Sequence, residues 1–429
     1  MDNSDSLEYL NQARSFADAE RYDDALEYIE KAISADRMNK EFYIEKCIIL
    51  ANMNRYDDAI ASLQNALKID KTYADAYFHM ANMCLMKGDK SSGILNYNKA
   101  IANGYDDAQI YFNLGLMYEE DGNLELALRN YTKAILKDPL RSDARVRKAG
   151  IFIAAGKRQE ALETVNELIL ADPDLFDGYH LKSKLLADMG KEEEAMAVLE
   201  EAVKLFPKDP AFLLDKINLL VEGKKPEEAE KLAKEIESSY ELENSQKRQL
   251  ELEKARLYAL KADINSIIDC LQKARAYTRK DDETAIDGEA TFLLVNCYLE
   301  KNDFKAAADC ARELIGSDNL AYAIPAYYML PYAYSQMGEK DKAEALYKES
   351  ISRLRKITLD QPELLDGYLF RALCLKDIGK YEKAMELSDY LLKMDDKRKE
   401  FHNLKAEVLY AMGKKDEAQA EKALAASLK

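Results

Sequence analysis

Three polar side chains in the first half of the chain have the chemistry to hold a peptide. Asn82, Asn113 and Arg147 are separated by 31 and 34 residues. An asparagine amide both donates and accepts hydrogen bonds, so it can hold the backbone of an extended peptide whatever its sequence. An arginine guanidinium can bind a ligand carboxylate through two parallel hydrogen bonds. We therefore predict a peptide-binding surface if the fold brings these residues together, and its further candidate residues are His79, Gln109 and Lys184.

Catalytic chemistry leaves no comparable signature in the sequence. The three histidines, His79, His180 and His402, share no metal-ligand spacing. There is no glycine-rich phosphate loop and no G-x-S-x-G nucleophile motif. The acidic run at 192–194 is typical of a solvated helix start, where the helix dipole favours negative charge. The sequence predicts no catalytic residue, no metal site and no cofactor.

Composition and charge exclude several classes of protein. The chain has 62 basic and 79 acidic residues, a net charge of −17, so it would repel nucleic acids and anionic membrane surfaces. No run approaches 18 consecutive apolar residues, and the acidic start has no apolar core of a signal peptide. Six widely spaced cysteines predict reduced, mostly buried thiols rather than disulfides. We expect a cytoplasmic protein with protein or peptide partners, no nucleic-acid partner and no membrane insertion.

A period of 34 residues dominates the chain. Four residue types share it, which a chance pattern would not produce. The members are glycines Gly88, Gly122, Gly156 and Gly190, prolines Pro139, Pro173 and Pro207, tyrosines Tyr9, Tyr43, Tyr77, Tyr111 and Tyr179, and alanines Ala25, Ala59, Ala127, Ala161, Ala195 and Ala229.

One period predicts a helical hairpin. Tyr111, Gly115 and Tyr118 step by four and three residues, the spacing of one helix face. Gly122 can take the positive φ that ends a helix, and Asp138 precedes a proline, which stops the next one. A single hairpin cannot bury its apolar face, so neighbouring hairpins must stack into a solenoid.

At these residues the chain resembles the tetratricopeptide repeat (TPR) family. The repeat that starts at Ala108 is close to the family pattern of aromatic, small, alanine and proline positions, with Tyr111, Leu114, Gly115, Tyr118, Ala127, Tyr131, Ala134 and Pro139. The resemblance implies an all-α fold, a right-handed superhelical solenoid of about twelve helix-turn-helix repeats. It also implies a non-catalytic scaffold or adaptor for protein–protein interaction. The alternative is a regulatory or targeting subunit of a multi-protein enzyme.

The spacing of the repeats predicts two arrays. Up to Ala229 the spacing is 34 residues, whereas the later repeats are 38, 40, 36, 41 and 34 residues apart. We therefore divide the chain into a regular array, 1–243, and a diverged array, 244–429. Extra residues in repeat proteins usually lie in loops, so insertions are expected at 281–283 and 358–362.

The family resemblance also defines which positions line the groove formed by the first helices. TPR modules that bind chaperone tails use a clamp of two lysines, two asparagines and an arginine. Asn82, Asn113 and Arg147 match three of these positions, but Phe78 and Asp143 occupy the lysine positions. Capture of a terminal carboxylate in that manner is therefore not expected, and the groove is predicted to bind an extended peptide.

Equivalent positions in the second array have an apolar character. Asn296, Tyr332 and Phe370 would either line a groove for an amphipathic helix or belong to the core, if the register drifts. The chain's last helix, around residues 421–429, is rich in alanine. We expect it to be polar enough to cover its own end, the alternative being that this end packs on another chain.

Overall fold

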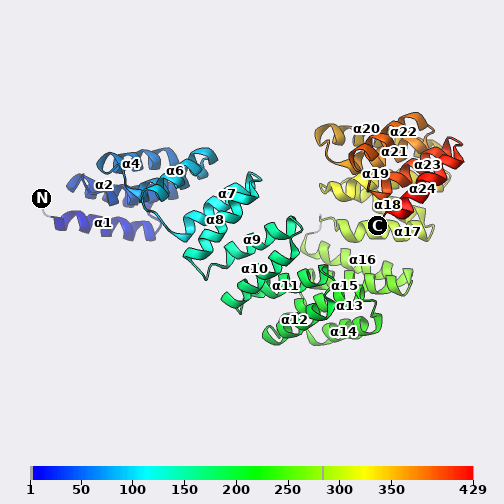
Figure 1. Cartoon of the computed structure of the whole chain (residues 1–429), viewed down its shortest axis with the longest axis horizontal. Helices are drawn as coiled ribbons and strands as arrows, with labels where there is room; N and C mark the ends of the chain where they lie inside the picture. The colour runs from blue at the N-terminus through cyan, green and yellow to red at the C-terminus, as the bar shows by residue number, and fades with distance from the viewer. Residues whose placement is uncertain (1–2, 283–284, 429) are drawn as a thin grey trace. The chain divides into compact units, whose positions relative to one another are not determined.

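The computed structural model describes residues 3–282 and 285–428. Over these residues it contains 24 α-helices, which pair into twelve hairpins, and no β-strand. From α1 to α11 and from α13 to α24 each helix packs against the next one, and first helices of successive hairpins also touch, for example α3 with α5 and α19 with α21. Figure 1 shows the succession of helices within each unit. The prediction of an all-α solenoid of helix-turn-helix repeats is confirmed.

The helices gather into two compact units, residues 1–198 and 199–429. The first unit contains α1 (Asn3–Asp18), α2 (Tyr22–Ala35), α3 (Lys40–Asn52), α4 (Tyr56–Ile69), α5 (Ala74–Met86), α6 (Lys90–Ala102), α7 (Ala108–Glu120), α8 (Leu124–Lys137), α9 (Ser142–Ala154), α10 (Arg158–Ala171) and α11 (Phe176–Asp188). The division falls within α12 (Glu192–Leu205). The second unit contains α13 (Ala211–Glu222), α14 (Pro226–Ser239), α15 (Asn244–Leu260), α16 (Ile264–Asp281), α17 (Gly288–Glu300), α18 (Phe304–Ile315), α19 (Leu320–Gln336), α20 (Lys340–Asp360), α21 (Leu365–Asp377), α22 (Tyr381–Met394), α23 (Lys399–Ala411) and α24 (Lys415–Ser427). The predicted change of repeat spacing near residue 244 lies inside this unit, at the start of α15, and stays a prediction.

The hairpin α7–α8 shows how the repeat residues produce the fold. Gly122 ends α7 with a φ of 72°, a conformation that favours glycine. A Cβ atom on Gly115 would lie only 2.5 Å from Cε1 of Tyr131, so only glycine lets the two helices approach this closely. Ala127 and Tyr131 are both fully buried in the same apolar cluster.

Extra residues in the second unit lengthen helices rather than loops. Thr358 lies within α20, which runs to Asp360, and only 361–362 of that predicted insertion lie outside the helix. The added turn is packed: the Thr358 hydroxyl donates to the Leu354 carbonyl oxygen, and a Cβ on Gly367 would lie 2.6 Å from the Thr358 methyl group. The other predicted loop begins at the last residue of α16, Asp281, while Glu283 lies outside the described residues. The expectation that both insertions form loops was therefore wrong for 358–360.

The cysteines agree with the prediction from their spacing. All six are free, five are buried, and Cys297 is half-buried. Across the described residues, no helix is long and apolar enough to cross a membrane.

Candidate functional site

The predicted peptide-binding residues lie on first helices of three successive hairpins in the first unit. Asn82 is on α5, Asn113 on α7 and Arg147 on α9. Both asparagines are half-buried, whereas Arg147 is exposed. These burial classes place the three side chains between the core and the solvent, where a ligand can reach them.

Tyr97 joins the two asparagines. Its ring is fully buried on α6, and its hydroxyl donates a hydrogen bond to Oδ1 of Asn82. The same hydroxyl accepts a hydrogen bond from Nδ2 of Asn113 at 2.8 Å. Burial raises the pKa of Tyr97 to about 12, so the hydroxyl keeps its proton and its role as a donor. The tyrosine thus fixes the orientation of both amides.

Gln109 and Arg141 extend this row of hydrogen bonds. Gln109 donates to Oδ1 of Asn113 at 2.7 Å and accepts from Arg141 at 3.0 Å. The Arg141 guanidinium lies 4.4 Å from the ring centre of Phe112 and pairs with Asp143 at 2.9 Å. A cation therefore lies beside Asp143, the position where the peptide clamps of the family have a lysine. We name Asn82, Tyr97, Asn113, Gln109 and Arg141 the amide row.

Arg147 belongs to a separate pair. Its Nη1 lies 3.7 Å from Oε1 of Glu119, and the other Glu119 oxygen accepts a hydrogen bond from Tyr131 at 2.5 Å. The Arg147 side chain is 54 % exposed. At this distance and exposure the Glu119 pair contributes little, so the guanidinium can turn to a ligand.

The two remaining candidates of the first unit are placed differently. His79 is half-buried on α5, its ring 5.4 Å from the ring of Phe78, and burial lowers its pKa. Lys184 is exposed on α11. In the described part of the chain, no hydrogen bond links either side chain to the amide row. Phe78 is buried and stacks on Tyr105 at 4.4 Å, so the position where the family's clamps have a lysine is part of the core in this chain.

Sequence reasoning missed the residues that hold the amide row together. Tyr97 and Tyr131 occupy an aromatic position of the repeat pattern, 34 residues apart, which marks them as core. The pattern does not indicate that their hydroxyl groups form hydrogen bonds with side chains of the groove, such as Asn82 and Asn113. No feature of the sequence distinguishes Arg141 and Glu119 as site residues, because the chain has many other charged residues.

The candidates of the second unit lie at the edge of its core. Asn296 is exposed on α17, while Tyr332 on α19 and Phe370 on α21 are half-buried. Tyr328 links the two rings: its centre lies 5.8 Å from that of Tyr332 and 6.3 Å from that of Phe370. The aromatic side chains therefore pack mainly on one another, which favours a core role for them.

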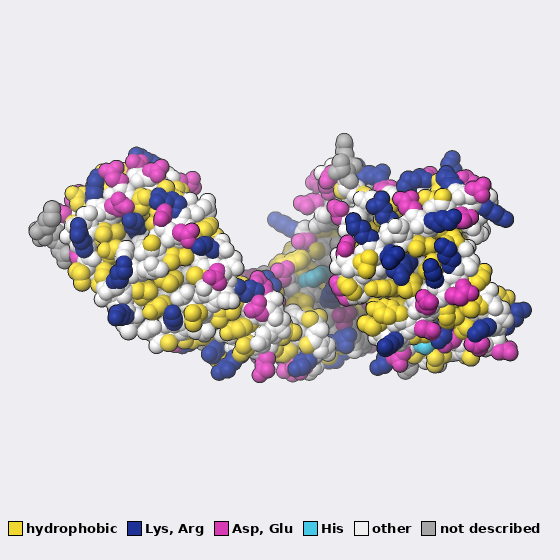
Figure 2. Space-filling model, turned by 90° about the horizontal axis from the view of Figure 1, so that it is seen from above, with side chains coloured by type: hydrophobic (Ala, Val, Ile, Leu, Met, Phe, Trp, Pro, Cys, Tyr) yellow, Lys and Arg dark blue, Asp and Glu magenta, His cyan; other side chains and the backbone are white. Residues whose placement is uncertain are grey.

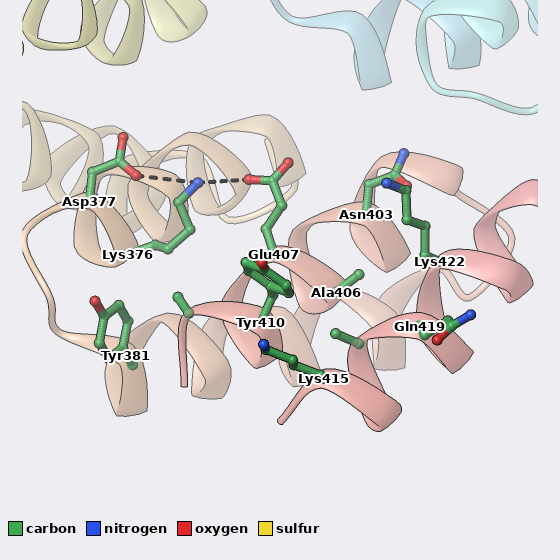
Figure 3. Close-up of a pocket in the computed structure, with 12 residues that line it drawn as sticks. Lys376, Asp377, Tyr381, Asn403, Ala406, Glu407, Tyr410, Lys415, Gln419 and Lys422 are labelled. Carbon is green, nitrogen blue, oxygen red and sulfur yellow. Dashed lines mark hydrogen bonds and ion pairs between the residues drawn. The ribbon is translucent and has the colours of Figure 1, made fainter. Parts of the chain in front are cut away.

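A pocket that the sequence did not indicate lies among α21, α22, α23 and α24. Its volume is about 940 Å³. Figure 3 shows Lys376 and Tyr381 toward one end of this pocket, and Gln419 and Lys422 toward the other. Lys376 pairs with Glu407 at 2.7 Å and with Asp377 at 3.2 Å. No group of three or more His, Cys, Asp or Glu side chains that could hold a metal ion occurs among residues 3–282 and 285–428.

Comparison with known families agrees with the hairpin architecture. Profiles described as TPR repeat or tetratricopeptide repeat match residues 9–38, 49–88, 85–128, 118–185, 186–242 and 324–353. The chain belongs to the tetratricopeptide-repeat family. TPR arrays are generally non-catalytic scaffolds for protein interaction. Both the TPR fold and the scaffold class follow from these matches.

Individual relatives are distant. No curated protein matches the sequence significantly. Among solved structures, YrrB, described as a TPR protein with an unusual peptide-binding site, is 23 % identical over 44 % of this chain and 97 % of its own, with a TM-score of 0.37. MamA from Desulfovibrio magneticus RS-1 is 20 % identical over 39 % of this TPR chain and 96 % of its own (TM-score 0.35). Naa15/Naa10 bound to HypK-THB is 15 % identical over 98 % of this chain and 68 % of the matched one (TM-score 0.40).

Proposed function

We propose that this TPR protein is a non-catalytic scaffold whose first unit binds an extended segment of a partner protein along the amide row and Arg147. The observation that carries the proposal is the Tyr97 hydroxyl held between Asn82 and Asn113. A ligand gains affinity when the groups that bind it are already held in place, because less side-chain freedom is lost on binding.

The hydrogen bonds within the row decide what it offers a ligand. Oδ1 of Asn82 and Oδ1 of Asn113 are both occupied as acceptors. Among the hydrogen bonds of the described residues none uses Nδ2 of Asn82, and Nδ2 of Asn113 uses one of its two hydrogens. The row therefore presents amide donors, which suit the carbonyl oxygens of an extended backbone.

Arg147 adds a preference for charge. Its guanidinium can exchange the loose Glu119 contact for a bidentate bond to a ligand carboxylate. We infer a ligand whose backbone carbonyls meet the asparagines and whose acidic side chain meets Arg147. Basic and acidic side chains are interspersed over the face drawn in Figure 2. Six free cysteines suit a reducing compartment, and we propose that the protein acts in the cytoplasm.

The test uses the full chain and a displayed library of random linear peptides. Selected peptides are titrated against the wild-type protein, the triple variant Asn82→Ala/Asn113→Ala/Arg147→Ala, and the control Arg129→Ala. Arg129 is an exposed arginine on the second helix α8. The triple variant should weaken binding at least about tenfold, which corresponds to about 1.4 kcal/mol. The control should bind as the wild type does.

Tyr97→Phe isolates the preorganisation. This variant keeps the buried ring and removes the hydroxyl that orients the asparagines, so binding should weaken although no surface group changes. Peptides that bind the triple variant as tightly as the wild type would end the proposal. A catalytic protein that co-purifies at fixed stoichiometry, with no selectable peptide, would favour a regulatory subunit instead.

A further inference from the structure

Two joints between hairpins, one near each end of the chain, share a pattern of positions. In both, the first helix of the hairpin buries two side chains, seven residues apart, against the preceding hairpin. They are Phe42 and Ile49 on α3, 1 % and 2 % exposed, and Phe401 and Val408 on α23, both fully buried. Phe42 and Ile49 pack in one cluster with Ile29 of α2.

The helix α1 carries polar side chains at these two positions. One period of 34 residues before Phe42 and Ile49 stand Glu8 and Ser15, and both are exposed. Glu8 accepts a hydrogen bond from the Gln12 side-chain amide at 3.4 Å. Within the described residues no cation pairs with Glu8. This face of α1 is therefore acidic where the internal joints are apolar.

The hairpin α23–α24 carries the opposite change. The position of Ile29 is filled by Tyr97, Tyr131 and Ser388 in other hairpins, and these side chains are fully buried. One period after Ser388 stands Lys422, which is exposed and pairs with no carboxylate of the described residues. The pocket of about 940 Å³ lies against this surface, with Lys422 and Gln419 at one end (Figure 3). Two of its lining residues, Ala406 and Ala418, stand one period after Ala372 and Ala384, which pack in one cluster with Phe401 of the adjoining first helix α23.

We propose that copies of this chain associate head to tail, with α1 of one copy lying in the α23–α24 pocket of the next. The equivalence of positions places Glu8 of one copy against Lys422 of the other. It also defines a second contact. In the internal joint between α21 and α23, Lys376 pairs with Glu407 at 2.7 Å. In the proposed joint, Tyr410 of one copy takes the position of Lys376, and Arg14 of the next copy takes the position of Glu407.

The second contact has matching chemistry. Tyr410 is 64 % exposed on α23, and Arg14 on α1 is ion-paired with Glu45 on α3, to which its Nε donates a hydrogen bond at 2.9 Å. A guanidinium over a tyrosine ring is a favourable cation–π pair. An ion pair and a cation–π pair thus replace the apolar contacts of the internal joints, which makes the association weak and sensitive to salt.

This interface joins two different surfaces. Association through it therefore grows with concentration, as an open chain or as a ring where the rotation between copies closes, instead of ending at a two-fold symmetric dimer. The inference is independent of the peptide site, because none of the residues of the amide row takes part in it.

Sedimentation velocity of the full chain from about 10 µM to 0.5 mM, at low and high salt, tests this association. The variants are Glu8→Lys, Lys422→Glu and their combination, with Glu125→Lys and Lys393→Glu as controls. Both control residues are exposed and lie on the second helices α8 and α22. We expect growth beyond the dimer at low salt and reversal at high salt.

Each single charge reversal should weaken association about five- to thirtyfold, because it replaces an attraction by a repulsion of similar size. The combined variant, which swaps the two charges, should associate as the wild type does. An equimolar mixture of the two single variants should associate too, since the lysine introduced on α1 of one variant then meets the glutamate introduced on α24 of the other. A chain that stays monomeric throughout, stops at a dimer, or ignores the charge swap would overturn the proposal.

Discussion

Two joints between neighbouring hairpins, one in each unit, are built with different chemistry. In the first unit the joint between α5, α6 and α7 is neutral: the buried Tyr97 hydroxyl bridges two asparagine amides. In the second unit the joint between α15 and α17 is ionic. Arg248 donates two hydrogen bonds to Asp287, at 2.6 and 2.8 Å, and the Asp287 side chain is 1 % exposed. The same repeat geometry therefore accepts either kind of contact.

The difference is related to helix length. The helices α15 and α16 have 17 and 18 residues, against 13 and 14 for α7 and α8. Longer helices extend past the alanine-lined contact of a regular hairpin, and at their ends they meet neighbours through long polar side chains. Asp287 also accepts a hydrogen bond from Thr278 in the last turn of α16 and caps α17. Such a deeply buried carboxylate is tolerated because its oxygens accept hydrogen bonds from Arg248, from Thr278 and from the Ala290 backbone amide.

The largest effect should come from removing this carboxylate. Asp287→Ala leaves Arg248 without its main partner and α17 without its cap, so the free energy of unfolding should fall by about 3–5 kcal/mol. Urea denaturation measures the loss. Asp318→Ala, an exposed aspartate in the loop before α19, is the control and should cost little.

Hydrogen exchange would show where the loss occurs. Protection should decrease in the second unit and persist in the first, because the two units have separate cores. Equal loss in both units, or a cost below about 1 kcal/mol, would contradict the contrast drawn between the neutral and the ionic joint.

A glycine pair tests the close approach in the first unit. Gly115→Ala would place a methyl group 2.5 Å from the Tyr131 ring, so it should destabilise the protein by about 1–3 kcal/mol through overpacking. Gly150→Ala, on the helix α9, meets no atom within 4 Å. It should be stabilising by about 0.5–1 kcal/mol, since alanine favours a helix. Thermal denaturation of both variants would show opposite shifts if the packing is as described.

The neutral joint should be less costly to break than the ionic one. Tyr97→Phe removes one hydroxyl and leaves a half-buried amide oxygen on Asn82 unpaired, a change of about 0.5–1.5 kcal/mol in the free energy of unfolding. Urea denaturation beside Asp287→Ala gives the comparison directly. If Tyr97→Phe lowered the free energy of unfolding as much as Asp287→Ala does, the Tyr97 hydroxyl would contribute more than a neutral hydrogen bond can.

The smallest effect is a difference in pH dependence between the units. Burial lowers the pKa of His79 in the first unit. Burial alone would also lower the pKa of His402 in the second, but hydrogen bonds to Glu421 at 2.8 Å and to the Asp396 carbonyl outweigh it and raise the pKa. Lys405, which pairs with both Glu421 and Asp389, and the Asp396 carboxylate are further charges near His402.

The signs are opposite. A raised pKa stabilises the fold below the ordinary histidine value of about 6.5, and this contribution is lost as the pH rises through the folded-state value. A lowered pKa destabilises the fold as the pH falls below about 6.5. Hydrogen exchange, corrected for the pH dependence of the intrinsic exchange rate, should show α23–α24 loosening as the pH rises from about 6.5 to 8 and α5 loosening as the pH falls from about 6.5 to 5. His402→Gln and His79→Gln should each abolish one slope, and the same slope in both regions would refute the assignment.

The repeat pattern was enough to predict most of the fold. Gly122, Gly115 and Ala127 define a turn and a close helix contact within about 20 residues, so the hairpin could be read from local spacing. The helix extension at Thr358 could not be predicted in this way. A stretch of five mixed polar and apolar residues is compatible with either a helix or a loop, and packing against a neighbouring helix decides between them. For the site, the pattern gave the positions of Asn82, Asn113 and Arg147, and the tertiary structure gave their partners.

Periodic properties could be predicted from the residues alone: which side chains face the core, where most helices end, and that hairpins must stack. These properties depend on neighbours within one or two turns of helix, so spacing alone expresses them. The tertiary structure decided which polar atoms meet across hairpins, such as the Tyr97 hydroxyl between two amides and Arg248 on Asp287. Such contacts depend on ångström-scale distances between side chains 15 to 40 residues apart, and no repeat pattern contains those distances.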